Sequence, residues 1–491
     1  MQKEDDLVKL HSGRAAIIGN LILFAFLILF IRLWYLQIYR GDIFHLYSVE
    51  NLLRKEVVKA PRGMIFSRNN NLLVHNVPRF DAIIIPQYLK NKNESLKKVA
   101  KVLDMPLTSI QKIIKKNSGQ ARYRPILLKK NISKKEVSII ETESYKMPGV
   151  MVDTFIGREY ALNESGAHLI GYISEISPSQ LPKYRKRDNY SYKQGDFIGK
   201  TGVEEQLDLD LRGFDGHQYM EVDAYGRMRR LLGSNYLFKG INNKNAQVGN
   251  NIRLTIDQDL QKTAFNSLGD KVGSVVMLDI HNGDVLAMAS TPSFDPTKVS
   301  RGLTHKYWNS LITNPAKPMI YKAIQEHYAP GSTFKVITSI AALEEGIISE
   351  NTKFNCPGFY KLGNRKFHCW KRHGHGEVSV TEAIRESCDV FFYMVALKLD
   401  IDTLAQYAKA YGFGSKTGIK IPREISGLIP NRDWKLKRTG EKWQKGETLS
   451  CVIGQSFVLS TPLQLALSYA AIANEGSLYR PKLVKDIFSN S

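Results

Sequence analysis

The chain has 491 residues, 43% hydrophobic and 24% charged, so it is long enough for about two or three domains and too apolar for a disordered protein. Its 69 basic and 47 acidic residues leave a net charge of +22, which suits an anionic membrane surface or an acidic wall polymer as well as nucleic acid. No zinc-finger, helix-turn-helix or RNA-reading aromatic pattern is present, so we expect no nucleic-acid partner. Four cysteines in so long a chain exclude a disulfide framework.

An apolar segment follows a short polar tail of residues 1–14. We predict a transmembrane helix over residues 15–37, because about 20 apolar residues span roughly 30 Å as a helix, the thickness of a hydrocarbon core. Trp34, Tyr35 and Tyr39 then form an aromatic belt at the interface. A cleaved signal peptide and a buried helix are the alternatives, but no small-x-small cleavage site follows the segment. Basic residues flank both ends, so charge alone does not orient the helix.

Residues 38–250 mix short alternating strand-like runs with polar helices. They contain turns and strand ends, but no nucleophile–base pair and no metal-ligand spacing. We interpret this region as a scaffold, in which the lysine-rich residues 90–146 form a solvated helical surface.

A new unit opens near residue 251. Residues 273–280 and 285–290 are typical of two strands of a β-hairpin, with the turn at Asn282-Gly283. Because strands come first and helices follow, we predict an α+β domain with an antiparallel sheet over residues 251–491.

The strongest chemical signal is a serine placed one helical turn before a lysine. Pro330-Gly331 predicts a turn and apolar residues at helical spacing follow it, so Ser332 lies at the start of a predicted helix with Lys335 on the same face. A lysine with a lowered pKa can take the hydroxyl proton, and a helix N-terminus favours an oxyanion. Ser95–Lys98 and Ser109–Lys112 share the spacing, but their polar surroundings indicate helix surface. A simple helix cap is the alternative for Ser332 as well.

The segment Ala329–Lys335 resembles the active-site segment of class B penicillin-binding proteins, and most nearly that of the elongation transpeptidases of the penicillin-binding protein 2 group. Further segments that resemble this family are 60–71, 158–161, 167–173, 199–213 and 221–227. The resemblance implies that residues 38–250 form the family's dimerisation or pedestal domain. It also implies that residues 251–491 form a penicillin-recognising serine transpeptidase domain.

Ser387-Cys388-Asp389 stands before a second apolar helix and resembles the family's Ser-x-Asn motif, in the aspartate variant of the elongation enzymes. The resemblance implies that Ser387 relays a proton between Lys335 and the leaving amine. It implies that Asp389 orients Lys335 and the substrate through charge-assisted hydrogen bonds. A serine or aspartate that merely caps the helix is the alternative.

The family's third motif, Lys-Thr/Ser-Gly, binds the substrate carboxylate from an edge strand. Lys416-Thr417-Gly418 matches its letters, but the residues around it resemble a Gly-Phe-Gly-x-x-Thr-Gly turn of the family, so we do not assign it to the active site. The segment from Gly454 resembles a region upstream of the third motif, and the sequence ends at Ser491. We therefore expect the transpeptidase domain of this sequence to be C-terminally incomplete.

Three cysteines and a histidine gather beside the second motif: Cys356, Cys369, His375 and Cys388. Three thiolates and one imidazole make a tetrahedral zinc set, although the spacing is looser than in a zinc finger. Separate buried cysteines or a disulfide are the alternatives. Some members of the penicillin-binding protein 2 group hold zinc at similar positions, so the resemblance implies one structural Zn²⁺ that braces the loop beside Ser387. We expect Cys451 to be a core residue.

The resemblance implies a single-pass protein of the cytoplasmic (inner) membrane, with residues 1–14 in the cytoplasm and the bulk of the chain in the periplasm. As a peptidoglycan D,D-transpeptidase, it would attack stem peptides through Ser332 with Lys335 as base, and β-lactams would acylate Ser332. The implied partner is a SEDS-type glycan polymerase that contacts the region of residues 40–250. The alternatives are an inactive scaffold of that polymerase, favoured by the missing third motif, and a penicillin sensor or serine β-lactamase, disfavoured by the long membrane-proximal region.

Overall fold

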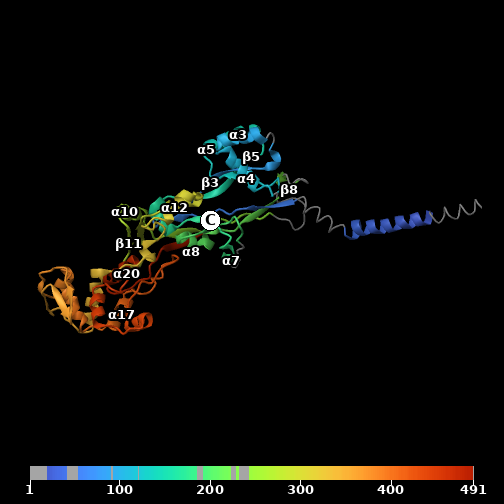
Figure 1. The fold of residues 1–491 in the computed structure, drawn as a ribbon. Helices are drawn as coiled ribbons and strands as arrows, with labels where there is room; N and C mark the ends of the chain where they lie inside the picture. The colour runs from blue at the N-terminus through green and yellow to red at the C-terminus, as the bar shows by residue number, and fades with distance from the viewer. Residues whose placement is uncertain are drawn as a thin grey trace, which may run out of the picture.

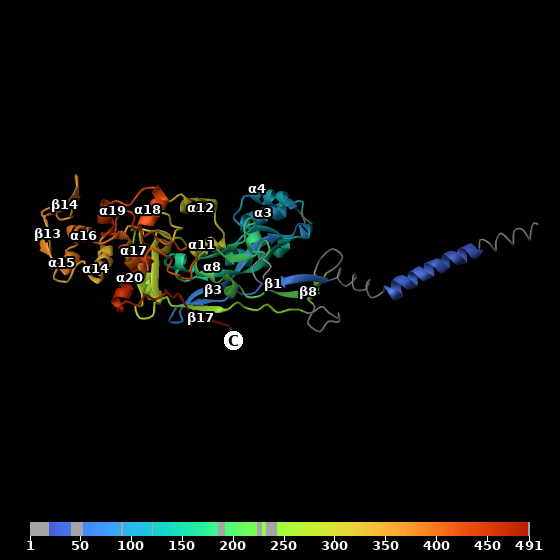
Figure 2. The same ribbon diagram turned by 90° about the horizontal axis from the view of Figure 1, so that it is seen from below.

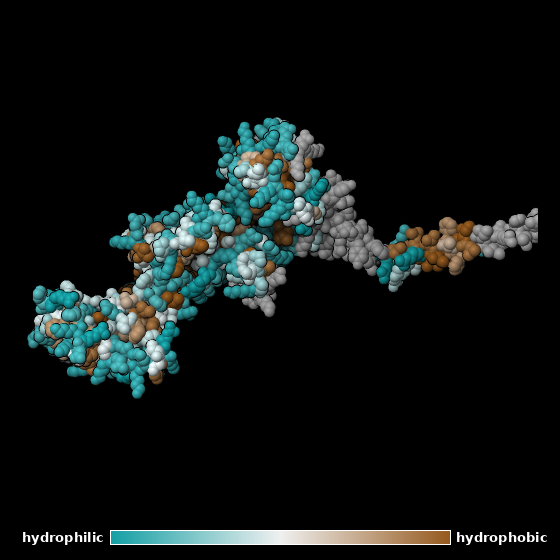
Figure 3. Space-filling view, in the orientation of Figure 1, coloured by the Kyte–Doolittle hydropathy of each residue, from teal (hydrophilic) through white to brown (hydrophobic). Residues whose placement is uncertain are grey.

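The computed structural model describes residues 19–40, 53–89, 92–119, 121–184, 192–222, 228–231 and 243–489. The predicted tail and the first residues of the predicted transmembrane helix lie outside this part of the chain. From Gly19 to Tyr39 the chain is one apolar helix of 21 residues, which is long enough to cross a membrane. Its most apolar 18 residues are not buried against the rest of the protein. Its last turn, Tyr35–Tyr39 (η1), is a π-helix in which the two tyrosine rings stack. Figure 3 shows this helix as a hydrophobic segment apart from the hydrophilic surface of the folded body.

The centre of the folded body is a six-stranded mixed sheet in the order β17-β10-β2-β3-β4, with β5 paired to β3. Its strands are β2 (Ile65–Phe66), β3 (Leu72–Ile84), β4 (Ile126–Lys129), β5 (Val150–Tyr160), β10 (Asn251–Leu254) and β17 (Val484–Phe488). β3 and β5 are antiparallel over their whole shared length, from Val74 opposite Tyr160 to Ile84 opposite Val150. The last strand, β17, lies antiparallel to β10 and returns the end of the described chain to the middle of the body (Figures 1 and 2).

A small helical head covers one end of β3 and β5, as Figure 1 shows. Its helices are α3 (Lys92–Val102), α4 (Leu107–Lys116) and α5 (Lys134–Thr142), with short 3₁₀ turns η2 (Pro86–Tyr88) and η3 (Ser144–Lys146) beside them. Lysines face solvent while Leu96, Val99 and Ile110 are buried against Ile84 of β3 in a core of their own. The lysine-rich region is therefore an amphipathic helical layer, because each helix has one apolar face that the sheet covers.

A second sheet adjoins the central sheet. It consists of β1 (Leu53–Val58), β8 (Gly216–Val222) and β9 (Met228–Leu231). The short elements between the two sheets are η4 (Asn163–Gly166), α6 (Ala167–Ile170), β6 (Ile173–Glu175), α7 (Leu181–Tyr184), β7 (Phe197–Gly199), α8 (Gly202–Gln206) and α9 (Asp208–Arg212).

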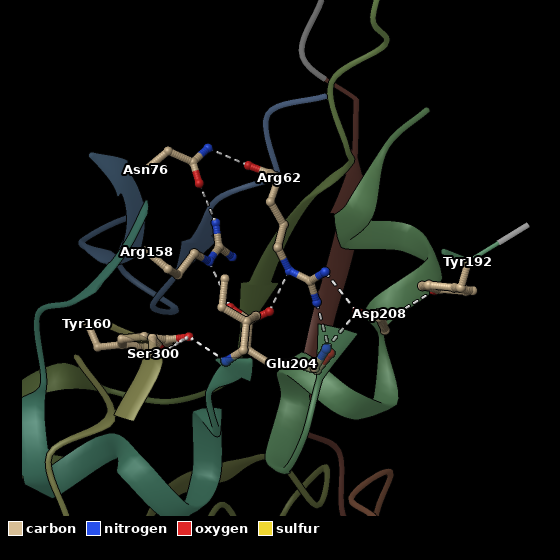
Figure 4. A network of polar contacts seen from close by, with 10 residues as sticks. Arg62, Asn76, Arg158, Tyr160, Tyr192, Glu204, Asp208 and Ser300 are labelled. Atoms are coloured by element: carbon tan, nitrogen blue, oxygen red, sulfur yellow. Dashed lines mark hydrogen bonds and ion pairs between the residues drawn. The ribbon is translucent and has the colours of Figure 1, made fainter. Parts of the chain in front are cut away.

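A polar network joins these elements to the central sheet. In Figure 4 the Glu204 carboxylate of α8 binds two arginines, Arg62 Nε at 2.6 Å and Arg158 Nε at 2.8 Å. Arg62 also reaches Asp208 of α9 at 2.8 Å, so this ion cluster joins segments far apart in sequence.

The predicted β-hairpin is confirmed, and Asn282 and Gly283 lie in its turn, which is wider than a two-residue turn. β11 (Gly273–Leu278) and β12 (Val285–Thr291) are antiparallel, but β11 ends at Leu278, two residues before the predicted end. Asp279 ends the strand because its carboxylate accepts a hydrogen bond from the backbone N–H of His281, which starts a wider turn. Helices α10 (Gln258–Leu268) and α20 (Pro462–Ala473) pack on the hairpin. The apolar side chains of α20 share one core with those of β2, β3, β10 and β12, so hairpin and central sheet are joined by packing, while those of α10 form a smaller cluster with the hairpin.

A helical lobe forms the end of the body opposite β1 and β8, as Figure 2 shows. Its helices are α14 (Lys335–Glu344), α15 (Val380–Arg385), α16 (Asp389–Ala396), α17 (Ile401–Ala410), α18 (Arg432–Thr439) and α19 (Lys445–Cys451). Two small hairpins adjoin them, β13 (Phe354–Cys356) with β16 (Gly376–Val378) and β14 (Phe359–Leu362) with β15 (Arg365–His368). Helices α11 (Pro296–Arg301), α12 (His305–Ile312) and α13 (Lys322–Gln325) connect the lobe to the hairpin. Phe334, Ile337 and Phe391 are fully buried at the centre of the lobe.

Candidate active site

Ser332 lies in a 3₁₀ turn, η5 (Gly331–Phe334), that leads directly into α14. The predicted helix start is thus confirmed, with a tighter first turn. Gly331 has φ = +60°, a conformation that glycine adopts without strain, and its N–H donates to the carbonyl of Gly454 at 2.9 Å. A side chain at Gly454 would collide with this turn, since an added Cβ would lie 2.4 Å from the Gly331 oxygen. Gly331 and Gly454, which are neighbours in space, therefore allow the turn to expose Ser332 to solvent while Phe334 points into the core.

Ser387 joins Ser332 to Lys335. The Ser387 hydroxyl donates to Ser332 Oγ at 2.8 Å, and Lys335 Nζ donates to Ser387 Oγ at 3.1 Å. Lys335 is only 1% exposed, so this contact is shielded from water on the lysine side. Ser387 has φ = +53°, a left-handed conformation that costs a non-glycine residue energy and that occurs preferentially at functional sites. The contact between the serine and the lysine of the first motif therefore runs through the serine of the second motif.

Asp389 holds the lysine from the other side. Its Oδ1 accepts a hydrogen bond from Lys335 Nζ at 2.7 Å, while Lys335 also donates to the Ser387 carbonyl at 2.9 Å. Asp389 is the first residue of α16, where the helix dipole favours a negative charge. The lysine Nζ lies 5.5 Å from the centre of the Phe392 ring, which adds a cation–π contact. All four residues that the sequence predicts for catalysis are thus brought together by α14 and the segment that enters α16.

The sequence-based prediction overlooked Trp370. Its backbone N–H donates to Asp389 Oδ2 at 3.2 Å, and its indole Nε1 donates to the carbonyl of Glu386 at 3.0 Å. The residue is 62% exposed, so a large aromatic surface stands open beside Ser387. An exposed aromatic next to a cysteine of the predicted metal cluster is a signal that could have identified it, because aromatic residues are enriched where surfaces bind partners.

The other Ser-x-x-Lys and Lys-Thr-Gly matches have different surroundings. Lys98 lies on α3 and pairs with Glu94 at 3.2 Å, one turn away, as expected for helix surface, whereas Ser95 is buried, contrary to the prediction. The backbone N–H and hydroxyl of Thr417 both donate to the Glu424 carboxylate, and Arg480 donates to the Gly418 carbonyl at 3.0 Å. Thr417 and Gly418 therefore use their polar groups to hold a turn, as the sequence interpretation expected.

The predicted metal ligands converge. The ligand atoms of Cys356, Cys369, His375 and Cys388 all lie within 4.8 Å of one another, and the three cysteines are buried. His375 Nδ1 is 3.6 Å from both Cys356 Sγ and Cys369 Sγ. A tetrahedral ion with a Zn–S bond of about 2.3 Å and a Zn–N bond of about 2.0 Å separates these ligand types by roughly 3.5 Å, so the donor set and its spacing fit zinc.

The four cysteines are free thiols, so a disulfide does not account for the cluster. A hydrogen bond with Cys388 lowers the pKa of the Cys369 thiol. Cys388 is the N-cap residue of α16, between Ser387 and Asp389, and Cys369 precedes Trp370. The cluster is thus built into the two segments that carry the polar groups around Lys335. Cys451 lies apart in the core of the lobe, where burial raises its pKa to about 12.

A solvent-facing serine at the head of a buried helix, joined through a second serine to a buried lysine, defines the class of serine acyl-transferring enzymes. The family model described as penicillin-binding protein dimerisation domain matches residues 57–254, and that of the penicillin binding protein transpeptidase domain matches residues 273–489. The chain belongs to the class B penicillin-binding protein family.

Relatives of the penicillin-binding protein 2 type support this assignment. Peptidoglycan D,D-transpeptidase MrdA of Acinetobacter baumannii is 33% identical over 479 residues, which are 97% of this chain and 70% of that protein. A solved complex between PBP2 and MreC from Helicobacter pylori is similar with a TM-score of 0.76 and 28% identity, over 89% of this chain and 82% of that chain. A chain of a peptidoglycan synthase complex is similar with a TM-score of 0.69 and 28% identity, over 97% of this chain and 80% of that chain.

Proposed function

We propose that this protein is a peptidoglycan D,D-transpeptidase of cell-wall elongation, which cross-links stem peptides through an acyl-enzyme on Ser332. The hydrogen-bonded series Ser332–Ser387–Lys335 is the observation that carries the proposal. A serine hydroxyl becomes nucleophilic when a neighbouring group accepts its proton, and this series supplies a path for that proton. The membership of the family, and the name of the relative from Acinetobacter baumannii, support the same reaction.

The proton path has a defined starting state. Lys335 Nζ lies within hydrogen-bond distance of three acceptors, the Ser387 carbonyl, the Ser387 hydroxyl and Asp389 Oδ1. As a base Lys335 reacts in its neutral amine form, and Asp389 at 2.7 Å holds its Nζ beside Ser387. Ser332 then attacks the carbonyl of the penultimate D-Ala while its proton passes through the Ser387 hydroxyl to Lys335. The same path returns the proton to the amine of the departing D-Ala, and an amine of a second stem peptide takes up the acyl group.

β-Lactams acylate Ser332 in this proposal, because they present a strained amide carbonyl in place of the D-Ala–D-Ala bond. Fluorescent penicillin is incubated with the wild type, with Ser332→Ala, and with Ser349→Ala as a control serine at an exposed position. Wild type and Ser349→Ala are expected to carry one covalent label, and Ser332→Ala none. Equal labelling of Ser332→Ala overturns the assignment of the nucleophile.

We propose further that Cys356, Cys369, His375 and Cys388 hold one structural Zn²⁺, which fastens the loop beside the catalytic residues. The spacing of the donor atoms supports this. Metal analysis of the purified protein is expected to find one equivalent of zinc in the wild type and in His373→Gln, whose side chain is exposed, and much less in Cys369→Ser. Stoichiometric zinc in Cys369→Ser contradicts the proposed ligand set.

The apolar helix Gly19–Tyr39 anchors the protein in the cytoplasmic membrane in this proposal, with the folded body on the periplasmic side, where peptidoglycan lies. The partner is a SEDS-type glycan polymerase that the pedestal contacts; the similarity to a chain of a peptidoglycan synthase complex supports it. Protease added to intact spheroplasts tests the orientation. Digestion of the folded body agrees with it, and complete protection refutes it.

A further inference from the structure

A second polar site lies where β3, the segment that enters α5 and the end of α11 meet. A cavity of about 410 Å³ opens here, within the range of about 300–1,000 Å³ typical of small-molecule sites. The charged groups that line it are Arg79 of β3, Lys129 of β4, Lys134 and Glu136 of α5, and Arg301 of α11. None of these residues belongs to the active site or to the cysteine cluster.

Arg79 is buried with part of its hydrogen-bonding capacity unused. The residue is 9% exposed, its Nη1 donates to the Ser300 carbonyl at 3.2 Å, and its Nη2 lies 3.9 Å from Asp81. Its Nε has no hydrogen-bond partner among the described residues. The Arg79 side chain packs against Gly157 of β5, because a Cβ atom added at residue 157 would lie 2.3 Å from Arg79 Cδ. Leaving such a buried donor unpaired costs free energy.

A second guanidinium repeats the pattern. Arg301 Nε is also buried without a hydrogen-bond partner in the part of the chain that the structure describes. Burial lowers the pKa of Arg79, and the positive charge of Arg301 lowers it further, against the opposing effect of Asp81. Two guanidinium groups that repel one another across a cavity are stabilised when an anion lies between them.

The remaining charges leave an excess of positive charge. Glu136 pairs with Lys129 at 2.8 Å, and Asp81 accepts a hydrogen bond from the backbone N–H of Asn131 at 2.6 Å. The four basic side chains that line the cavity are therefore opposed by only two carboxylates, those of Glu136 and Asp81. The nine-residue helix α5 also begins at the cavity wall, where the Glu136 carboxylate of its capping box already accepts hydrogen bonds from Ser133.

We propose that this cavity binds a phosphate dianion, free or as the ester of a small molecule, between Arg79, Arg301 and Lys134. A dianion balances the excess charge, and guanidinium forks match phosphate oxygens in geometry. The cavity lies between the helical head and α11, so the bound anion ties these two elements to one another.

Binding is measured on the full-length protein in a non-ionic detergent by calorimetric titration with inorganic phosphate, and separately with glycerol 3-phosphate, at constant ionic strength. Saturable binding of either anion at one site per chain is expected, and tighter binding of glycerol 3-phosphate identifies an ester as the preferred form. Arg301→Gln is expected to weaken binding at least about tenfold and Lys134→Gln about threefold.

Lys135→Gln is the matched control, because Lys135 is the exposed neighbour of Lys134 and does not line the cavity. It is expected to bind as the wild type does. The absence of saturable binding of both anions, wild-type affinity in Arg301→Gln, or an equal loss in Lys134→Gln and Lys135→Gln each overturns the proposal. Arg79 is left unchanged, because its burial against Gly157 makes a substitution there a test of folding as well.

Discussion

The pedestal and the head of α14 each bury a cation against a carboxylate, yet the two regions differ in what surrounds the ion pair. In the pedestal, both oxygens of Glu204 are occupied by arginines, and the carboxylate is fully buried. At α14, Lys335 binds Asp389 and also a serine in a left-handed conformation, whose hydroxyl contacts the exposed Ser332.

The two regions differ in their access to solvent and in the strain of their backbone. The pedestal network is closed to water and links segments from Arg62 to Asp208, so it stabilises one arrangement of the chain. Burial lowers the pKa of Arg62, but the carboxylates of Glu204 and Asp208 raise it by more, so this arginine stays charged. The site at α14 is open on one side and strained at Ser387, and a substrate can therefore use its polar groups. The following changes test this contrast, beginning with the largest expected effect.

Lys335→Ala removes the proposed base. Acylation of Ser332 by fluorescent penicillin is expected to slow about 10²- to 10⁴-fold, since proton transfer by a positioned side chain contributes a factor of that size. Lys398→Ala, an exposed lysine after α16, is the control and is expected to react at the wild-type rate. Stopped-flow or gel-based labelling measures the rate, and an unchanged rate in Lys335→Ala contradicts the role of the lysine.

Glu204→Gln breaks the pedestal network by leaving Arg62 and Arg158 without their shared charge. Loss of one partner from a buried ion cluster costs about 3–5 kcal/mol of unfolding free energy. Glu205→Gln is the matched control, because Glu205 pairs with the exposed Arg423 at 2.7 Å, and such surface pairs contribute at most about 1 kcal/mol. Urea denaturation compares the two variants, and equal losses would show that burial does not distinguish these pairs.

His168 of α6 makes the contact between the pedestal and the β11–β12 hairpin sensitive to acid. Burial lowers the pKa of His168 to about 4, and its Nε2 lies 2.7 Å from the Pro318 carbonyl. An unfolded histidine has a pKa of about 6.5, so between about pH 6.5 and pH 4 the unfolded chain binds the extra proton. Stability from this group is complete above about pH 6.5 and is lost as the pH falls, by about 2 kcal/mol between pH 7 and pH 5.

The measurement for His168 is the midpoint of urea denaturation at pH 7 and pH 5. His168→Gln is expected to reduce the difference between the two midpoints, whereas His281→Gln, at an exposed position, is expected to keep it. A difference that stays the same in His168→Gln assigns the acid sensitivity to other groups.

Local sequence patterns predicted a large part of the fold. The apolar run became one helix, the turn at Pro330-Gly331 led into α14, and the paired runs near Asn282-Gly283 formed a hairpin. These predictions succeeded because they depend on the spacing of neighbouring residues, which governs helices and hairpins directly. The end of β11 was predicted two residues too late, since Asp279 forms its own turn, and the side-chain hydrogen bond responsible is visible only in three dimensions.

The sequence alone determined which chemical groups this protein has: a serine and lysine one helical turn apart, a second serine with an aspartate, and three cysteines with a histidine in one stretch. Only the tertiary structure decided how they meet, because the contacts of Ser387 with Ser332 and of Glu204 with Arg62 join residues 55 and 142 positions apart. Contacts of that separation depend on the packing of whole elements, such as β17 returning to β10, and no local pattern encodes them. The Nε groups of Arg79 and Arg301, which have no hydrogen-bond partner among the described residues, belong to the same category, since their shared cavity exists only after the head has folded onto α11.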